Sequence, residues 1–146
     1  MIYKEEYCDV TEKVSEYVTA QCISENCAMG EGVVLAFRKK FPGLKAACME
    51  YIENIRTHNL TEYLSDNNLY VPYRHIDGRR VLYNMFTKKK YWYKAGKGMT
   101  YNQYLQNLED SLFMVKAMMI ANHEQKLAIP RIGCGLDCCQ WSDVKK

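Results

Sequence analysis

Long apolar runs are missing from this chain of 146 residues. No stretch approaches the roughly 20 apolar residues that a membrane-spanning helix needs. The first residues, Met1–Glu6, do not form a signal peptide. Internal repeats and low-complexity tracts are absent too. With 48% apolar and 25% charged residues, the composition is that of a globular and not a disordered chain.

Paired metal-ligand motifs are also lacking. Four residues separate Cys22 from Cys27 and three separate Cys134 from Cys138, and neither is a good zinc spacing. The three histidines are isolated from one another. We therefore expect no metal and no cofactor. The seven cysteines, an odd number with no secretion signal, indicate reduced thiols in an intracellular protein, in the cytoplasm or the nucleus.

Neither sign of charge dominates the chain. Twenty Lys and Arg stand against 17 Asp and Glu, and the resulting net charge of +3 does not by itself argue for nucleic acid. The one dense basic run is Lys88–Lys90, and aromatic and basic residues follow it between Tyr91 and Met99. Such a mixture can bind single-stranded nucleic acid. A solvated loop with packed rings is the favoured interpretation, so we expect neither nucleic acid nor a membrane as a partner.

What the sequence does contain is an alternation of strands and helices. Apolar, β-branched and aromatic runs predict strands at residues 2–7, 17–23, 69–76, 81–87 and 127–132. Helical spacing of apolar residues predicts helices over 33–40, over 44–55 and from residue 100 onward, where Thr100 and Gln103 fit a capping box. Asp77-Gly78 predicts a hairpin turn, and residues 91–99 a loop. The order predicts an α/β sheet covered by helices, in a single domain over residues 1–146.

Two glycine-containing loops stand where a binding crevice would need them. Gly30-Glu31-Gly32 lies between a predicted strand and a helix N-terminus, a place that offers free N–H groups to a phosphate. A nucleotide-type dehydrogenase is not favoured, because residue 35 is Leu where the full Gly-x-Gly-x-x-Gly pattern needs Gly. The second loop, Pro130–Asp137, follows an apolar run and ends in a carboxylate. The loop alone fits a binding loop and a plain tight turn equally well.

Three stretches together resemble a known family. They are AQCISENCAMGEG at 20–32 followed by FRKKF at 37–41, then YNMFTKK at 83–89, and PRIGCGLD at 130–137 followed by Gln140-Trp141. In their order and their residues they resemble the macrodomains, specifically the branch of terminal ADP-ribose protein glycohydrolases, also described as O-acetyl-ADP-ribose deacetylases. The resemblance implies a three-layer α/β/α fold with a mixed central sheet. It also implies an enzyme that removes ADP-ribose from acidic side chains of proteins and deacylates O-acyl-ADP-ribose.

The resemblance implies the site residues as well. The nucleophile would be Lys88, with Lys89 as the other possible register, and the acid that resolves a lysyl–ADP-ribose adduct would be Asp137. A lysine can attack only when its amine carries no proton, and a carboxylate can orient water or move protons. Ligand contacts would come from Asp9, Val10, Ser24, Met29, Gly30, Gly32, Thr87, Arg131, Ile132, Gly133, Cys134, Gly135 and Leu136.

The chain departs from the family in four places. Gln21 stands where the family's closest members have a histidine, Cys8 replaces a glycine, and the loop Ala95–Met99 is longer. The sequence ends at Lys146, where the family continues with a helix and a last strand. That end predicts a rearranged sheet edge, a strand-sharing dimer or a truncated form. The competing functional hypotheses are a macrodomain that binds ADP-ribose without turnover and a nucleic-acid-binding module using Lys88–Lys97.

Overall fold

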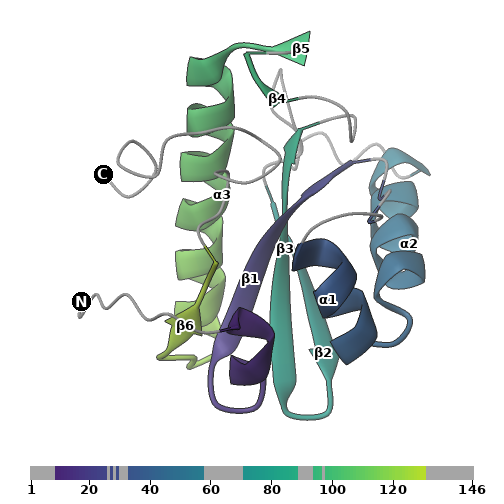
Figure 1. Cartoon of the computed structure of the whole chain (residues 1–146), viewed down its shortest axis with the longest axis vertical. Coiled ribbons are helices and arrows are strands. Elements are labelled where there is room, and N and C mark those ends of the chain that lie inside the picture. The colour runs from purple at the N-terminus through teal and green to yellow at the C-terminus, as the bar shows by residue number, and fades with distance from the viewer. Residues whose placement is uncertain are drawn as a thin grey trace.

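A computed structural model describes residues 9–25, 27, 29, 33–57, 71–88, 94–96 and 98–130 of the chain. Its main sheet has the strand order β2-β3-β1-β6 (Figure 1). Strand β1 (Val18–Ser24) runs parallel to both β3 (Arg80–Lys88) and β6 (Leu127–Ala128), while β2 (Tyr73–Asp77) is antiparallel to β3. The sheet is therefore mixed, as predicted.

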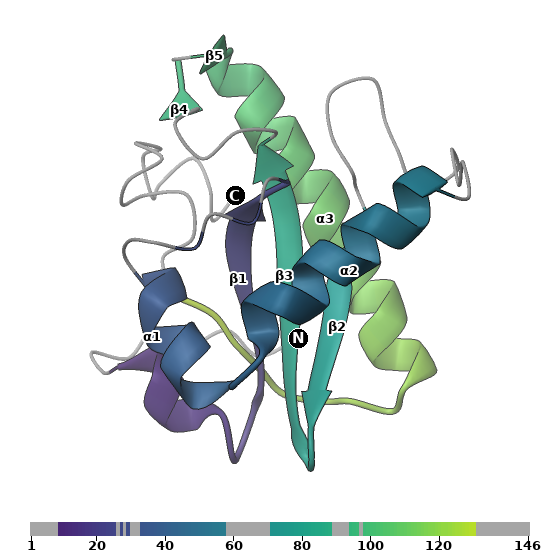
Figure 2. The ribbon, with the colours of Figure 1, turned by 90° about the vertical axis from the view of Figure 1, so that its right-hand side faces the viewer.

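Helices cover the sheet on both faces. Figure 2 shows α1 (Val33–Lys40) and α2 (Leu44–Thr57) in front of the strands and α3 (Tyr101–Ala121) behind them. Each face has its own apolar cluster. Leu82 and Phe86 pack with α1 and α2, whereas Tyr83 and Met85 pack with α3. This burial on both faces explains why successive residues of β3 from Val81 to Tyr83 are all apolar, without a polar alternation. The three-layer α/β/α architecture is confirmed.

Local sequence signals predicted most of the described elements. Helix α1 has the predicted bounds, and α3 begins with the predicted capping box, in which Thr100 accepts from the Gln103 N–H. The β2–β3 hairpin turns at Gly78 and Arg79, and the positive φ of Gly78, 64°, suits a residue without a Cβ. Of the helices that the structure describes, none is long and apolar enough to cross a membrane.

Some predicted elements differ from those observed. The strand expected at 69–76 begins only at Tyr73, after Pro72, which has no N–H to donate. The expected loop at 91–99 contains two short paired strands, β4 (Lys94–Ala95) and β5 (Gly98–Met99). The described part of the last predicted strand pairs only at Leu127–Ala128. The strand expected at 2–7 lies outside the described residues, as does the chain beyond residue 130, on which the predicted sheet-edge rearrangement depends.

Candidate active site

The carboxyl ends of two neighbouring parallel strands meet at one edge of the sheet. Ser24, the last residue of β1, pairs with Lys88, the last residue of β3. Just beyond them, the N–H of Glu25 donates to the carbonyl of Lys88 over 2.9 Å. In open α/β sheets the ligand crevice lies outside the carboxyl ends of the strands. The structure thus brings together three residues predicted for the site, Ser24, Thr87 and Lys88.

The pairing of β1 with β3 is irregular at this end. Ile23 pairs with Phe86 but Ser24 pairs with Lys88, which leaves Thr87 as an extra residue on β3. Such bulges bend a strand, re-aim its side chains and occur next to active sites. Lys88 itself is only 8% exposed. Lysine is rarely buried to this extent, so its position favours a role beyond that of a solvated surface charge.

Helix α3 contacts the bulged residue from behind the sheet. The side-chain amide of Asn107 donates to the carbonyl of Thr87 over 3.1 Å, and the hydroxyl of Thr87 donates to the Tyr104 hydroxyl over 3.4 Å. Both α3 side chains are buried. The residue before Lys88 is therefore fixed through its backbone and its side chain.

The loop that leaves β1 is held differently. Cys27 and Met29 have positive φ values of 56° and 51°, and both side chains are buried in the cluster under α1 and α2. Non-glycine residues enter this left-handed region at a cost of about 1–2 kcal/mol each. Arg38 of α1 donates to the Met29 carbonyl over 3.1 Å. Burial and this hydrogen bond therefore offset backbone strain in the loop that leads to Gly30 and Gly32.

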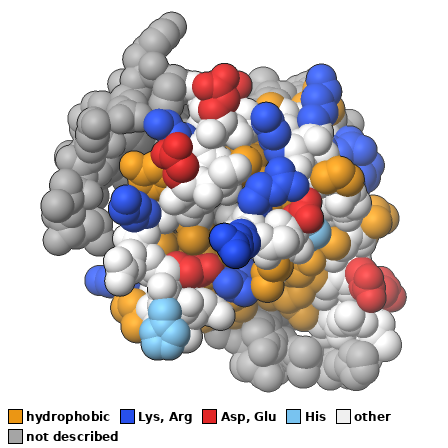
Figure 3. Space-filling view, turned by 90° about the horizontal axis from the view of Figure 1, so that it is seen from below, with side chains coloured by type: hydrophobic (Ala, Val, Ile, Leu, Met, Phe, Trp, Pro, Cys, Tyr) orange, Lys and Arg blue, Asp and Glu red, His pale blue; other side chains and the backbone are white. Residues whose placement is uncertain are grey.

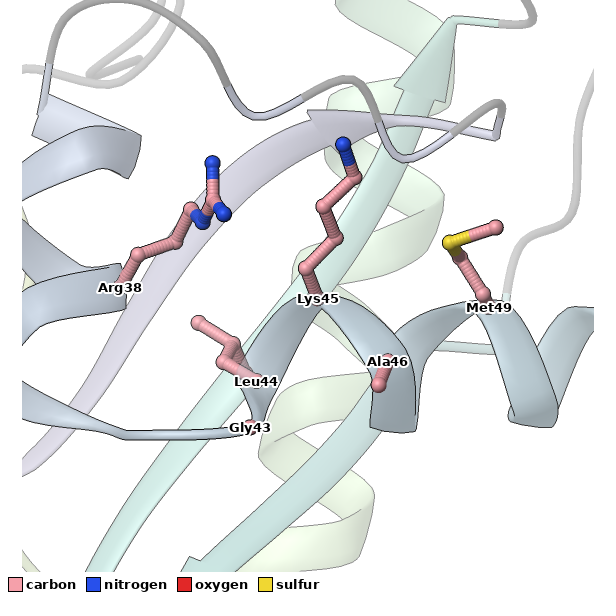
Figure 4. Close-up of a pocket in the computed structure, with 6 residues that line it drawn as sticks. All are labelled: Arg38, Gly43, Leu44, Lys45, Ala46 and Met49. Carbon is pink, nitrogen blue, oxygen red and sulfur yellow. The ribbon is translucent and has the colours of Figure 1, made fainter.

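A hollow of about 360 Å³ lies where α1 passes into α2. Figure 4 shows Arg38 and Lys45 extending from their helices in the same direction, with Leu44 between them and Met49 one turn further along α2. Among the residues that the structure describes, none of those predicted for the site lines it. Arg38 connects this hollow to the loop after β1, because its guanidinium also donates to the carbonyl of Met29.

Asp9 and Val10 lie away from Lys88. Val10 begins the 3-10 helix η1 (Val10–Lys13), which precedes β1 and lies at the lower end of the sheet in Figures 1 and 2, whereas β1 and β3 end at the upper end. Asp9 caps η1, accepting from the N–H and the hydroxyl of Thr11 over 2.9 and 2.7 Å. These two bonds, and next the charge of Lys40, lower the pKa of Asp9. In this arrangement its carboxylate acts as a helix cap.

The remaining predicted site residues lie outside the described part of the chain. These are Gly30, Gly32, the alternative nucleophile Lys89 and the whole loop Arg131–Asp137. Within the described residues, no group of three or more His, Cys, Asp or Glu side chains lies close enough together to hold a metal ion.

Two residues that contact the site, Tyr104 and Asn107, were missing from the sequence prediction. Both are buried in α3. Asn107 carries a usable signal, because it lies three residues after Tyr104 and four before Ser111 and so shares their buried face. A polar residue on an apolar helix face needs a partner. The partner, Thr87, is 20 residues away and is not readable from spacing.

Gln21, predicted to depart from the family pattern, is fully buried in β1. Its amide donates to the Asn84 side chain of β3 over 2.8 Å, and Asn84 in turn donates to the carbonyls of Tyr73 and Leu82. Gln21 thus links the neighbouring strands β1 and β3 by a side-chain hydrogen bond, three residues before Ser24.

Comparison with known proteins finds relatives by sequence and by structure. No protein-family model matches the chain. The ADP-ribose glycohydrolase OARD1 of Homo sapiens is 36% identical over 125 residues, which cover 86% of this chain and 67% of the human protein. The Bos taurus protein of the same name is 36% identical over 123 residues, covering 84% of this chain and 66% of its own. The chain thus spans about two thirds of the length of these curated relatives.

Solved structures share the fold at lower identity. The macrodomain of Thermus aquaticus DarG superposes with a TM-score of 0.69 at 19% identity, covering 90% of this chain and 80% of that one. Thermosipho africanus DarTG, solved in complex with ADP-ribose, superposes with a TM-score of 0.64 at 16% identity, covering 87% of this chain and 32% of that one.

Proposed function

The chain belongs to the macrodomain family, with OARD1-type ADP-ribose glycohydrolases as its relatives, and on that premise we propose that it is an ADP-ribosyl hydrolase. Its substrates are proteins that carry ADP-ribose on acidic side chains, together with O-acyl-ADP-ribose. Lys88 is the nucleophile and Asp137 the acid–base residue. Residues 1–146 act as one macrodomain inside the cell.

The position of Lys88 is the observation that supports this proposal most. It is a buried lysine at the end of a parallel strand, paired with Ser24 and preceded by a bulge. A lysine that serves only as a solvated charge needs none of these features. An enzyme that forms a covalent intermediate needs its nucleophile on a rigid support beside the binding loop.

The chemistry proceeds in two steps. The neutral amine of Lys88 forms a bond to C1″ of the distal ribose, while the bond from C1″ to the carboxyl oxygen of the modified side chain breaks and the carboxylate leaves. Water then attacks C1″ and displaces the lysine nitrogen, and Asp137 takes a proton from that water. ADP-ribose and the free amine are the products.

Binding of ADP-ribose is assigned to the two glycine-containing loops. The strained loop through Met29 leads into the N-terminal end of α1, where free N–H groups suit a diphosphate. Residues 131–136 would supply the facing contacts. Asp9 and Val10 are the weakest members of the proposed set, because η1 lies at the other end of β1.

The experiment is a comparison of turnover and binding in the full chain. A protein modified with ADP-ribose on glutamate is incubated with the wild type and with Lys88→Ala, and released ADP-ribose is measured beside its equilibrium binding. We expect turnover by the wild type and a loss of about a thousandfold or more in Lys88→Ala, with binding retained. A wild type that binds ADP-ribose but releases none would make the protein a reader. Full activity in Lys88→Ala would remove Lys88 as nucleophile.

A further inference from the structure

We propose that Asn107, supported by Tyr104, is a positioning residue for the Lys88 nucleophile, an inference that rests on the proposed hydrolase function. We do not propose that either side chain contacts the substrate or the reacting atoms. Both act through Thr87, the residue that precedes Lys88 on β3.

The need for such a residue follows from the bulge. The extra residue of a bulge is left without a regular ladder partner. Thr87 is that residue, since Ile23 pairs with Phe86 and Ser24 with Lys88. The β2 ladder does not reach it either, because the last pair between β2 and β3 is Tyr73 with Asn84. A buried carbonyl without a donor would cost about 1–3 kcal/mol, so the fold must supply one from elsewhere.

Helix α3 supplies the donor. Asn107 is 4% exposed, and its amide nitrogen lies 3.1 Å from the Thr87 carbonyl oxygen. The carbonyl belongs to the peptide unit that joins Thr87 to Lys88. On the other side of Lys88, its own carbonyl accepts from Glu25. The backbone of the nucleophile is thus held at both of its peptide bonds, once from α3 and once from the end of β1.

Tyr104 adds a second constraint on the same residue. It is fully buried, and its hydroxyl accepts from the Thr87 hydroxyl over 3.4 Å. Backbone rotation at Thr87 would break both contacts with α3, so they oppose the local motion that would move Lys88. A displacement of about 1 Å in a reacting group can cost up to about a hundredfold in rate.

The chain offers a matched control in Ser111. It lies on the same face of α3, one turn after Asn107, and is fully buried. Its hydroxyl has no hydrogen-bond partner within the described part of the chain. Ser111→Ala therefore alters a buried polar residue of the same helix without touching Thr87.

The test measures kcat, KM and ADP-ribose binding for Asn107→Leu, Tyr104→Phe and Ser111→Ala, with Lys88→Ala alongside. Asn107→Leu is expected to lower kcat by about ten- to a hundredfold, with KM and ADP-ribose affinity near wild type. Tyr104→Phe, which removes a single oxygen and is the milder change for folding, is expected to lower kcat about fivefold. Ser111→Ala is expected to behave as the wild type.

Two results would overturn the inference. One is wild-type kcat in Tyr104→Phe, together with wild-type kcat or loss of folding in Asn107→Leu. The other is a parallel loss of kcat and affinity that Ser111→Ala shares, which would indicate a general effect on α3. Failure of the proposed function is recognised separately: the wild type would then release no ADP-ribose, or Lys88→Ala would turn over substrate like the wild type.

Discussion

The two ends of the sheet are held by different kinds of interaction. At the carboxyl ends of β1 and β3, backbone carbonyls accept from the side chains of Asn107 and Arg38, and the loop beyond β1 contains two buried left-handed residues, Cys27 and Met29. Toward the opposite end, charged side chains predominate. Glu124, just after α3, accepts from Tyr83 over 2.5 Å and pairs with Arg74 over 2.8 Å.

Further charged contacts lie toward that opposite end. The ammonium groups of Lys13 and Lys126 lie 5.9 and 5.7 Å from the centre of the Tyr17 ring. Figure 3, which shows the molecule from below, has acidic and basic side chains interspersed over the described surface and no region of one sign. A nucleic-acid surface would need a continuous basic patch, so this face offers none.

The difference teaches where stability and function are separable. Charged residues at the lower end of the sheet, the end opposite Lys88, can be substituted with little consequence for Lys88. Tyr83, which contacts them, precedes Lys88 by five residues, or about 16 Å of extended strand. At the upper end, where β1 and β3 end, the backbone is strained at Cys27 and Met29, so few residues there can be replaced without a structural change. We therefore expect substitutions at the lower end to alter stability alone, and substitutions at the upper end to alter stability, function or both.

The largest effect is expected at Met29. Met29→Ala removes a buried side chain and should lower the free energy of unfolding by about 2–4 kcal/mol. Met29→Gly removes the same contacts but relieves the left-handed backbone, so it should be about 1 kcal/mol more stable than the alanine variant. Denaturant unfolding of both variants measures the difference.

Met85 provides the control for that pair. It is also buried, but it lies in the extended strand β3 and does not have a positive φ. There glycine should be less stable than alanine. If glycine is less stable than alanine at position 29 as well as at position 85, the loop after β1 is not strained. The contrast between the two ends of the sheet then fails.

A smaller effect on stability is expected from Glu124→Gln. The substitution removes the charge that Arg74 faces and weakens the bond from Tyr83, at a cost of about 2 kcal/mol in unfolding free energy. The hydrogen bond to Glu124 raises the pKa of Arg74, which therefore stays charged. Turnover measured well below the unfolding temperature should match the wild type. A drop in kcat without a drop in stability would show that the lower end is coupled to Lys88.

The smallest effect is a pH dependence from His75. Burial lowers its pKa, with the charge of Asp77 as an opposing influence. The folded chain therefore takes up the proton less readily than the unfolded chain, whose histidine titrates near about 6.5. The free energy of unfolding should fall as the pH drops below that value and level off below the folded pKa. His75→Gln should flatten this slope, and an unchanged slope would exclude His75 as its source.

The sequence predicted best what depends on neighbouring residues. The bounds of α1 and the capping box of Thr100 and Gln103 came from short patterns, and the sheet covered by helices followed from the alternation of strands and helices. The family resemblance placed Ser24, Thr87 and Lys88, which the fold brings to one edge.

What the sequence could not predict depends on distant contacts. The bulge at Thr87 arises from the register of two strands more than 60 residues apart, and the bond from Asn107 depends on how α3 packs. Left-handed Cys27 and Met29 are not expected from residue type, since glycine usually takes that conformation. The capping of η1 by Asp9 was not expected from the sequence, and its predicted contact with the ligand stays a prediction.

The most direct test of the account is the identity of the lysine that becomes modified. Asp137→Ala, which should form the lysyl adduct but resolve it slowly, is incubated with substrate, and the modified peptide is mapped by mass spectrometry. The account predicts a single ADP-ribosyl group on Lys88, at a rate that Asn107→Leu lowers in the same background. An adduct on Lys89, or rapid turnover with no dependence on any lysine, would contradict it.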